Sequence, residues 1–296
     1  VSSTVSDNET PNAKNAQVAL VNGEEFINRW KEKNSLISPI LGPHAIYSMN
    51  LEQLEETRKL ANKNNVPLSI HLSESQFEND FSNQNYGMTS IEALESINFF
   101  NGATIAAHVV WPSDKEIEIL ARKNVGVVHN PTSNMKLASG VAPISKMIDA
   151  GVLIGLGTDG AASNNDLDMW EEMRLASLLQ KVTSMDPEVL SAIEVLRMAT
   201  SNGAKIIGME GEIGIIARGM KADIIQIAYD DVHHVPSYDI ASHLIYVTDE
   251  QDVINVIIDG KLIMHQKEFL TLDIKRIREE VASISNTINE TINSNQ

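Results

Sequence analysis

Five short apolar runs in this chain each end on a histidine or an aspartate, and a helical pattern follows every one. The runs occupy residues 35–44, 66–71, 103–108, 125–129 and 152–159, and they end at His44, His71, His108, His129 and Asp159. Runs rich in Val, Ile, Leu and Ala without polar alternation are typical of strands buried on both faces of a parallel sheet. Because carboxyl ends of parallel strands meet at one edge, the sequence predicts a βα array with imidazoles and a carboxylate along that edge.

The segments between these runs carry signals of helix starts. Three of them match the pattern in which a short polar side chain caps a helix and a Glu or Gln three residues later bonds back. These pairs are Asn50 with Gln53, Thr89 with Glu92, and Ser113 with Glu116. Pro143 and Pro187 fit the first turn of two further helices, the second with Asp186 as its N-cap. The polar stretch 78–87 instead predicts a loop that serves as a lid.

The composition is that of a globular protein with an excess of acidic groups. Its 296 residues are 43% hydrophobic, and the formal net charge is −17. Nucleic acids and anionic membrane surfaces are bound by clusters of Lys and Arg, so this charge argues against both as partners. No apolar run is long enough to span a bilayer and no signal peptide is visible, so we expect a cytoplasmic protein. The chain has no cysteine, which restricts any metal site to histidine and carboxylate ligands.

The pattern changes after about residue 208. Segments 211–231 and 252–265 contain short apolar runs separated by glycine turns, which is typical of a small β-sandwich. We therefore expect a (β/α) barrel portion over residues 1–208, and a β-sandwich portion with a C-terminal helix over 209–296. In that helix, apolar residues recur at spacings of three and four from Ile274 to Ile292. We expect this stripe to pack on its own domain, because a coiled coil would need more heptads and charged flanks.

Three of the strand-end residues and one nearby carboxylate form a set suited to metal chemistry. Glu74 follows His71 by three residues, and His108 and Asp159 end later strands. Two imidazoles and one carboxylate suit Zn²⁺ or a similar divalent ion that keeps a position for water. An unligated carboxylate beside that water, such as Glu74, can act as a base. The pattern therefore favours a metal-dependent hydrolase.

Each of these residues also has a structural explanation when it is taken alone. A strand-end histidine is more often a hydrogen-bonded structural residue than a ligand, and Asp159 stands in a glycine-flanked turn. Their occurrence at successive strand ends favours the functional interpretation. For His129, which Asn130 and Pro131 follow, we prefer a structural role at the end of its strand. The paired glycines near Asp159 do not match a phosphate-binding loop.

The segments that carry these residues resemble a known family. GPHAIYS, IHLSES, AAHVVWPSDKEIEIL, VHNPTSNMKLASG and GLGTDGAASNNDLDMWEEMRLASLLQK are similar to segments of the methylthioadenosine/S-adenosylhomocysteine deaminases of the amidohydrolase superfamily. The resemblance runs from about Leu36 to the end of the chain and is most specific over 158–181. It implies a TIM-like (β/α)8 amidohydrolase barrel with a small β-sandwich, and one divalent metal ion with Zn²⁺ as the expected ion. It also implies a small-molecule nucleoside substrate.

The resemblance further implies a role for each site residue. His71 and Asp159 would be metal ligands, and His108 would position the attacking water. Glu74 would be the proton shuttle, and Asp159 would take a proton from the water. His44, Glu74 and Asp159 would contact the substrate. The implied reaction is hydrolytic deamination of 5′-methylthioadenosine or S-adenosylhomocysteine to the inosyl product and ammonia.

Part of the family pattern is absent from this sequence. The family begins with a strand ending in His-x-His, which supplies two metal ligands, whereas no histidine precedes His44. An Arg of the family's substrate loop is also unmatched, since that loop offers only Lys14. If Asp159 ends the eighth strand of the barrel, counting strands back from it shows that this sequence contains about strands 3–8 and lacks the first two. We therefore expect an N-terminally truncated chain whose open barrel is inactive and binds metal weakly when isolated, and we leave a homo-oligomer open.

Two other functions stay open at this point. One is a related amidohydrolase that acts on another heteroaromatic ring, as guanine deaminases and triazine chlorohydrolases do. The other is a non-catalytic remnant that keeps the surface of the fold without turnover. A panel of ring substrates separates the first from a thionucleoside deaminase, and lack of the His-x-His strand in the whole gene product would favour the second.

Overall fold

The computed structural model describes residues 1–31, 33–34 and 36–294, and the chain divides into two compact units. Unit 1 comprises Val1–Ile215 and Pro236–Glu250, and unit 2 comprises Ile216–Val235 and Gln251–Gln296. Ser35, the first residue of the first apolar run, lies outside the described residues. The domain boundary after residue 208 stays a prediction.

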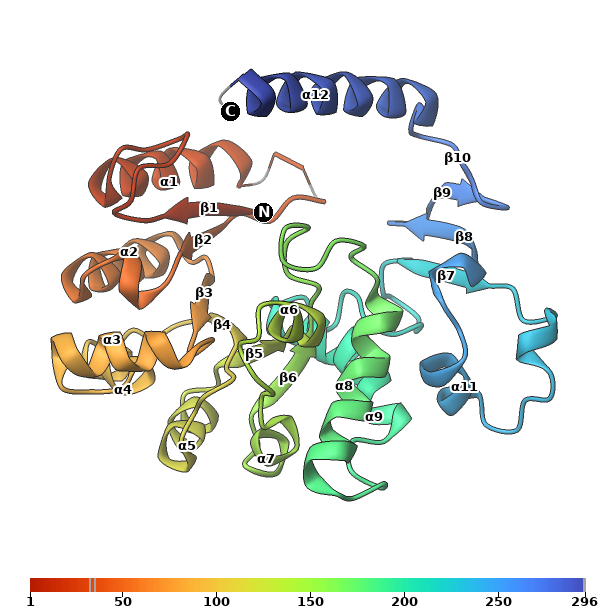
Figure 1. Cartoon of the computed structure of the whole chain (residues 1–296), viewed down its shortest axis with the longest axis horizontal. Helices are drawn as coiled ribbons and strands as arrows, with labels where there is room; N and C mark the ends of the chain where they lie inside the picture. Colours follow the sequence, from red (N-terminus) through yellow and green to blue (C-terminus); the bar gives the residue numbers. More distant parts are fainter. Residues whose placement is uncertain (32, 35, 295–296) are drawn as a thin grey trace. The chain divides into compact units, whose positions relative to one another are not determined.

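The sheet of unit 1 has six parallel strands whose spatial order is their order in the chain (Figure 1). They are β1 (Ser2–Val5), β2 (Ile40–Pro43), β3 (Leu68–Leu72), β4 (Thr104–His108), β5 (Gly126–His129) and β6 (Leu153–Leu156). The register between β3 and β4 places His71 opposite Ala107, and Leu72 opposite His108. Since all strands run the same way, their carboxyl ends lie at one edge, which confirms the predicted βα array.

Helices connect the successive strands, as the capping signals predict. Those before β6 are α1 (Ala16–Trp30), η1 (Ile46–Ser48), α2 (Leu51–Asn64), α3 (Gln76–Tyr86), α4 (Ser90–Ser96), α5 (Asp114–Arg122), α6 (Pro131–Lys136) and α7 (Ile144–Asp149). Those after it are α8 (Met169–Ser184), α9 (Ala192–Arg197), η2 (Met198–Asn202), α10 (Gly203–Ile206) and α11 (Ile240–Tyr246). Reciprocal capping boxes are present at the starts of α2, α4 and α5, which confirms the three predicted pairs. Among the described helices, none is long and apolar enough to span a bilayer.

Two local predictions are wrong. The stretch 78–87 is a helix, α3, rather than a loop; Glu78 and Ser82 are buried in it, and Gly87 ends it with φ 66°. The polar composition misled because most of these side chains form the exposed face of a helix, while the carboxyl of Glu78 is buried and accepts from backbone N–H groups. Pro187 starts no helix: α9 begins after Ser191, whose reciprocal bonds with Glu194 cap it better than Asp186 would.

Burial along β3 alternates, which differs from the expected strand buried on both faces. Leu68, Ile70 and Leu72 are buried in the main hydrophobic cluster, whereas Ser69 and His71 between them are half-buried. The side chains of one face therefore supply the core, and those of the other face remain accessible to a ligand.

A buried arginine joins α2 to the chain that precedes β4. Nε of Arg58 donates to the carbonyl of Phe99 at 2.6 Å, and its Nη2 donates to Oγ1 of Thr104 at 2.6 Å. Arg58 is 3% exposed, and burial lowers the pKa of its guanidinium to about 10. The planar fork of Arg lets one side chain reach acceptors in different directions, which a single ammonium cannot do.

Unit 2 contains an antiparallel sheet and a long helix. The strands are β7 (Ile224–Ile227), β8 (Val253–Ile258), β9 (Lys261–His265) and β10 (Glu268–Phe269), in the order β10-β9-β8-β7. Asp259 and Gly260 both have positive φ, as a tight turn between antiparallel strands requires. The helix is α12 (Ile274–Ser294), and none of its residues is buried. From Ile277 to Ile292 the residues of its apolar stripe are 41% to 60% exposed, so the expectation that this stripe packs on its own domain is wrong.

We expect Arg58→Lys to lower the free energy of unfolding by about 2–4 kcal/mol, because buried acceptors then lose charged donors. Equilibrium urea unfolding measures this change. Arg122→Lys is the matched control: Arg122 forms a largely exposed pair with Glu95 at 3.3 Å, and its loss costs less than about 1 kcal/mol. Equal losses in the two variants would contradict a structural role for Arg58.

Candidate metal centre and active site

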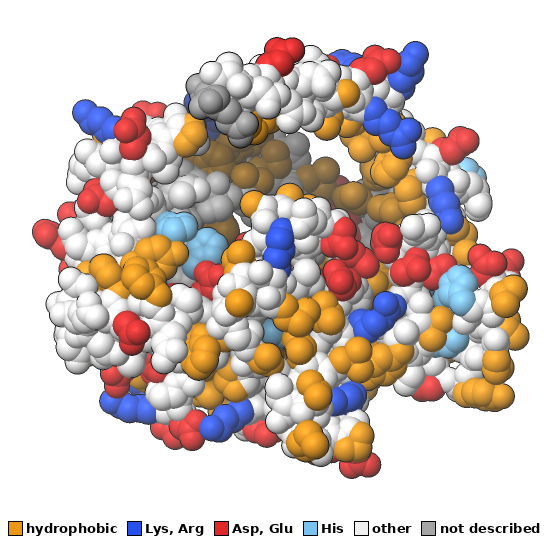
Figure 2. Space-filling model, viewed as in Figure 1, with side chains coloured by type: hydrophobic (Ala, Val, Ile, Leu, Met, Phe, Trp, Pro, Cys, Tyr) orange, Lys and Arg blue, Asp and Glu red, His pale blue; other side chains and the backbone are white. Residues whose placement is uncertain are grey.

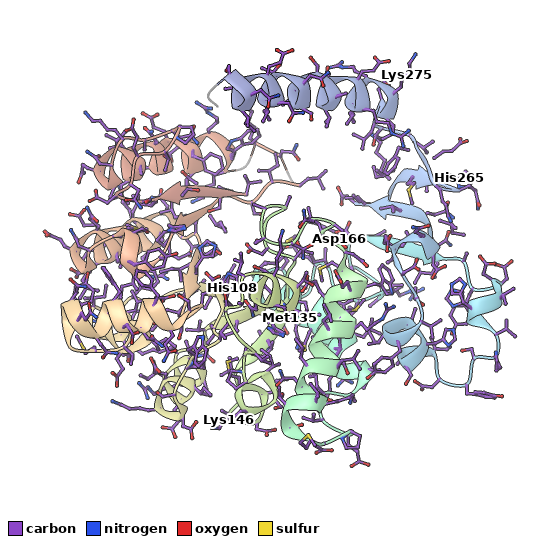
Figure 3. The ribbon with its side chains drawn as sticks, viewed as in Figure 1. His108, Met135, Lys146, Asp166, His265 and Lys275 are labelled. Atoms are coloured by element: carbon purple, nitrogen blue, oxygen red, sulfur yellow. The ribbon has the colours of Figure 1, made fainter. Side chains whose placement is uncertain are left out.

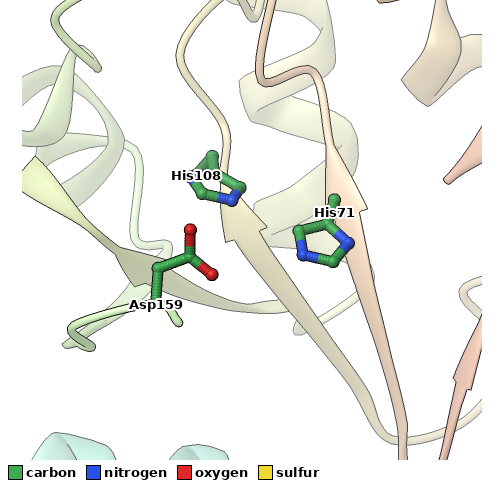
Figure 4. A group of neighbouring side chains, drawn as sticks. All are labelled: His71, His108 and Asp159. Atoms are coloured by element: carbon green, nitrogen blue, oxygen red, sulfur yellow. The ribbon is translucent and has the colours of Figure 1, made fainter. Parts of the chain in front are cut away.

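His71, His108 and Asp159 come together at the carboxyl edge of the parallel sheet. His71 lies near the end of β3, His108 ends β4, and Asp159 follows β6. One ligand atom of each lies within 4.8 Å of those of the other two, and Figure 4 shows the side chains around a common space. The rings of His71 and His108 stack with centroids 5.5 Å apart. Neighbouring parallel strands thus assemble the cluster that the strand-end pattern predicts.

Hydrogen bonds fix the orientation of both imidazoles. Nδ1 of His71 lies 2.8 Å from the carbonyl oxygen of His44, and Nδ1 of His108 lies 2.8 Å from Oδ1 of Asn134. These oxygens only accept, so Nδ1 carries the proton in each ring and the Nε2 of a neutral ring keeps its lone pair. His108 is 1% exposed and stands at the end of β4 (Figure 3). Metal-binding histidines are held in this way, with the second nitrogen donating to an oxygen.

Asp159 is held as a carboxylate by two serines. Its Oδ2 accepts hydrogen bonds from Oγ of Ser133, at 2.8 Å, and from Oγ of Ser163. Burial acts to raise the pKa of Asp159, but the bonds from Ser163 and Ser133 outweigh it and hold the pKa below its usual value. Asp159 is therefore ionised at neutral pH, which is the form that binds a metal ion.

The backbone is strained where the site residues stand. Ser73, His108 and Asp159 have φ of 49°, 73° and 61°, in the left-handed region that L residues seldom adopt. Each such residue costs on the order of 1–3 kcal/mol and clusters of them occur at functional sites. The strand ends therefore turn sharply at the positions that project side chains into the common space.

Glu74 extends from the end of β3 toward His108. Its Oε2 lies 3.9 Å from Nε2 of His108, and its Oε1 accepts from Oγ of Ser139 at 3.3 Å. The backbone N–H groups of Ser73 and Glu74 donate to the two oxygens of the Glu78 carboxyl, at 2.7 and 3.0 Å. Glu78 thus fixes the segment that carries Glu74 beside the cluster.

His44 lies next to the cluster on the neighbouring strand end. Its ring is 5.1 Å from that of His71, and its Nδ1 lies 3.0 Å from Oγ of Ser48. Burial lowers the pKa of His44, and nearby His71 lowers it further, so the ring is neutral at neutral pH. Tyr47 packs edge-on against His44, and pale blue histidine side chains reach the surface on the face drawn in Figure 2. The position of His44 suits contact with a bound molecule.

His129 differs from the other strand-end histidines. It is fully buried, it is not part of the cluster, and neither ring nitrogen has a hydrogen-bond partner among the described residues. Burial lowers the pKa of His129 to about 3, so its ring stays neutral. The structural role that the sequence favours for His129 stays a prediction.

Four residues that orient the site were not recognised in the sequence. They are Glu78, Ser133, Asn134 and Ser163. Ser133 and Asn134 belong to the HNPTSN segment, where only the capping properties were considered. Glu78 follows Glu74 by four residues, a spacing that places both near one helix start. Ser133 and Asn134 bond to residues 26 positions away in the chain, whereas the partners of Glu78 and Ser163 are local.

The sequence model of the amidohydrolase family matches residues 2–263. The chain belongs to this family. A 5-methylthioadenosine/S-adenosylhomocysteine deaminase of Carboxydothermus hydrogenoformans is 46% identical to this amidohydrolase over 268 residues, which cover 90% of this chain and 62% of the relative. A 5′-deoxyadenosine deaminase of Methanosarcina mazei is 40% identical over 284 residues, 96% of this chain and 65% of the relative. The family resemblance inferred from the sequence motifs is confirmed.

A solved structure is similar over nearly the whole of this amidohydrolase. The crystal structure of an adenosine deaminase from Xanthomonas campestris with bound zinc superimposes with a TM-score of 0.95 at 33% identity. The match covers 98% of this chain and 66% of that chain. The chain thus spans somewhat less than two thirds of the length of the relatives that it matches.

We expect Glu78 to make stability depend on pH. Burial raises the pKa of Glu78 from its ordinary 4.5 to about 7, although hydrogen bonds from Ser73 and Glu74 oppose the shift. The protonated Glu78 carboxyl stabilises the folded state, and this stabilisation is complete below pH 4.5. It is lost as the pH rises through 7, because the folded chain must then ionise a buried carboxyl. The stability advantage of the wild type over Glu78→Gln should fall by about 3 kcal/mol from pH 4.5 to 8. Urea unfolding across this range measures it.

Glu55→Gln is the control for this pH series, because Glu55 lies on the exposed face of α2. Its stability curve should run parallel to that of the wild type. If the Glu78→Gln curve is also parallel, Glu78 does not carry the shifted pKa.

Proposed function

We propose that this amidohydrolase deaminates adenine thionucleosides, 5′-methylthioadenosine or S-adenosylhomocysteine, to the inosyl product and ammonia. The observation that carries the proposal is the cluster of His71, His108 and Asp159, with the carboxylate of Glu74 beside it at 3.9 Å from His108. The names of the most similar relatives, which are deaminases of adenine nucleosides, support the substrate class. A zinc-bound structural neighbour supports Zn²⁺ as the cofactor.

His71 and Asp159 would hold the metal ion. The donor set fits a divalent ion, because the Nδ1 bond of His71 leaves Nε2 as a ligand and the lowered pKa of Asp159 keeps it anionic. When bound, the ion supplies Lewis acidity that lowers the pKa of a water molecule. His108, held by Asn134, would position this water.

Proton transfers would then fall to the two carboxylates. Asp159 takes a proton from the water as the water oxygen bonds to the ring carbon that bears the amino group. Glu74 delivers a proton to the adjacent ring nitrogen, which relieves the negative charge that the addition creates. The proton held by Asp159 then passes to the amino group, the carbon–nitrogen bond breaks, and ammonia leaves. The added hydroxyl becomes the ring carbonyl by returning a proton to Glu74, which is thereby restored to its protonated form. One water is consumed and one ammonia is released.

His44 would contact the substrate. Its neutral ring can donate and accept hydrogen bonds, which suits an uncharged nucleoside. The ring of Tyr47 lies beside it, and that of Phe77 lies 5.8 Å from Tyr47, which provides apolar surface for a nucleoside side group. Lys and Arg side chains are scattered among acidic ones on the face in Figure 2, which supports a small molecule rather than a nucleic acid or membrane as partner.

We also propose that β1–β6 correspond to strands three to eight of a (β/α)8 barrel, with residues 209–296 as a β-sandwich portion and helix. A strand ending in His-x-His would then come from outside this sequence and complete the metal site. The greater length of the relatives supports this assignment. A cytoplasmic location is part of the same proposal.

Glu74→Gln in the complete gene product should lower kcat by roughly 10²–10⁴-fold, because the shuttle can no longer exchange a proton. Zinc content should stay at the wild-type value, since Glu74 is not a ligand. Ammonia release from 5′-methylthioadenosine and metal analysis measure the two quantities. Glu118→Gln, an exposed change on α5, is the matched control. Unchanged turnover in Glu74→Gln would refute the shuttle role.

A substrate panel tests the reaction itself. We expect the highest kcat/KM for 5′-methylthioadenosine or S-adenosylhomocysteine, with 5′-deoxyadenosine as the next candidate because of the Methanosarcina relative. If guanine or a chlorotriazine is the preferred substrate, the proposed activity is wrong and the protein has another amidohydrolase activity. No turnover of any ring by a zinc-loaded complete protein would favour the non-catalytic alternative.

A further inference from the structure

A second cluster of metal-ligating side chains lies in unit 2 and shares no residue with the site at the parallel sheet. It consists of His233, His234 and Asp252, and one ligand atom of each lies within 4.8 Å of the others. Nε2 of His233 lies 3.1 and 3.2 Å from the two oxygens of Asp252. Nε2 of His234 lies 3.3 Å from Oδ2 of the same carboxylate. Both imidazoles therefore direct the same nitrogen at one carboxyl group.

A short helix and the start of a strand, 19 residues apart in the chain, bring these three residues together. The two histidines belong to the short helix η3 (Val232–His234), and Asp252 directly precedes β8. The ring of Tyr229 stacks on that of His234 with centroids 4.7 Å apart, and the two histidine rings lie 4.1 Å apart. This stacking restricts the rotation of the imidazoles, so the three ligand atoms are held in place before any ion binds.

The spacing of the ligand atoms fits a tetrahedral ion. Zinc bonds to nitrogen and oxygen of about 2.0–2.2 Å place neighbouring ligands roughly 3.2–3.6 Å apart in a tetrahedron. The nitrogen–oxygen distances of 3.1 to 3.3 Å need little adjustment to reach this range. Two imidazoles and one carboxylate suit zinc and cobalt better than the hard ions magnesium and calcium, which prefer oxygen.

Burial and access also suit a bound cation. The side chains of His234 and Asp252 are 0% and 8% exposed, whereas that of His233 is 44% exposed. A buried carboxylate needs a compensating positive charge, which an ion or a protonated imidazole supplies. The exposed side of His233 gives an ion a path from solvent and room for a water as fourth ligand. Asp230 and Asp231 precede η3 and add negative charge to this segment.

We propose that His233, His234 and Asp252 form a structural site for a divalent transition metal ion, with Zn²⁺ as the expected ion. The ion joins the segment before α11 to the start of β8 and thereby stabilises unit 2. This inference is independent of the proposed deaminase activity, because the two sites have no ligand in common.

Zinc titration against a chromophoric chelator tests the proposal in an Asp159→Asn background, which weakens the other site. This chain should bind one zinc ion. Adding His233→Gln should weaken zinc binding at least roughly tenfold, since one of three protein ligands is lost. Gln can still donate a hydrogen bond to Asp252, so the fold of the segment is retained. His265→Gln is the matched control: His265 lies on β9 (Figure 3) and bonds to Asn255 rather than to a carboxylate.

Thermal unfolding supplies a second readout that needs no change at Asp159. Excess zinc should raise the Tm of the wild type more than that of His233→Gln, while the two have similar Tm values in a chelator. Equal zinc affinity with and without the His233→Gln change, together with equal zinc-induced Tm shifts, would overturn the proposal. The cluster would then be a hydrogen-bonded His–Asp–His group only.

Discussion

The parallel register between neighbouring strands is the constraint on which the site depends. Pairing of Leu72 with His108 aligns the ends of β3 and β4, so that His71 and His108 emerge side by side. Pairing of β5 with β6 then places Asp159 beyond the same edge. A slip of one residue would turn His71 to the opposite face of the sheet. The buried faces of β3 to β6 therefore set both the stability of unit 1 and the geometry of its metal ligands.

The strand register brings the three side chains of the cluster together, and hydrogen bonds from residues outside the cluster fix their orientation. Asn134 holds His108, the carbonyl of His44 holds His71, and two serines hold Asp159. Such contacts decide the tautomer of each ring and the charge of the carboxylate, and hence whether these side chains can bind a metal ion and position a water molecule. Positive φ at His108 and Asp159 shows that the chain accepts strain to present them.

The titratable groups of unit 1 have different protonation states because their burial and hydrogen bonding differ. Asp159, whose serine partners offset its burial, stays ionised, whereas burial prevails at Glu78 and raises its pKa. His129, without a bonding partner among the described residues, stays neutral in the core. The same residue types thus have different protonation states because their surroundings differ, a property that proton transfer at neutral pH requires. In unit 2, one carboxylate faces two imidazoles, which produces the second cluster.

The sequence by itself determined the βα order, the capping boxes and the short strands with glycine turns after residue 208. It also identified His44, His71, His108 and Asp159 as strand-end groups, with Glu74 close to one of them. These features follow from local periodicity and from residue type, which need no knowledge of distant contacts. Only the tertiary structure decided that 78–87 is a helix, that Asn134 and two serines orient the ligands, and that His233 and His234 meet Asp252. Asn134 and Ser133 bond to residues 26 positions away and His233 to one 19 positions away, and pairwise contacts of that kind leave no periodic trace in a single sequence.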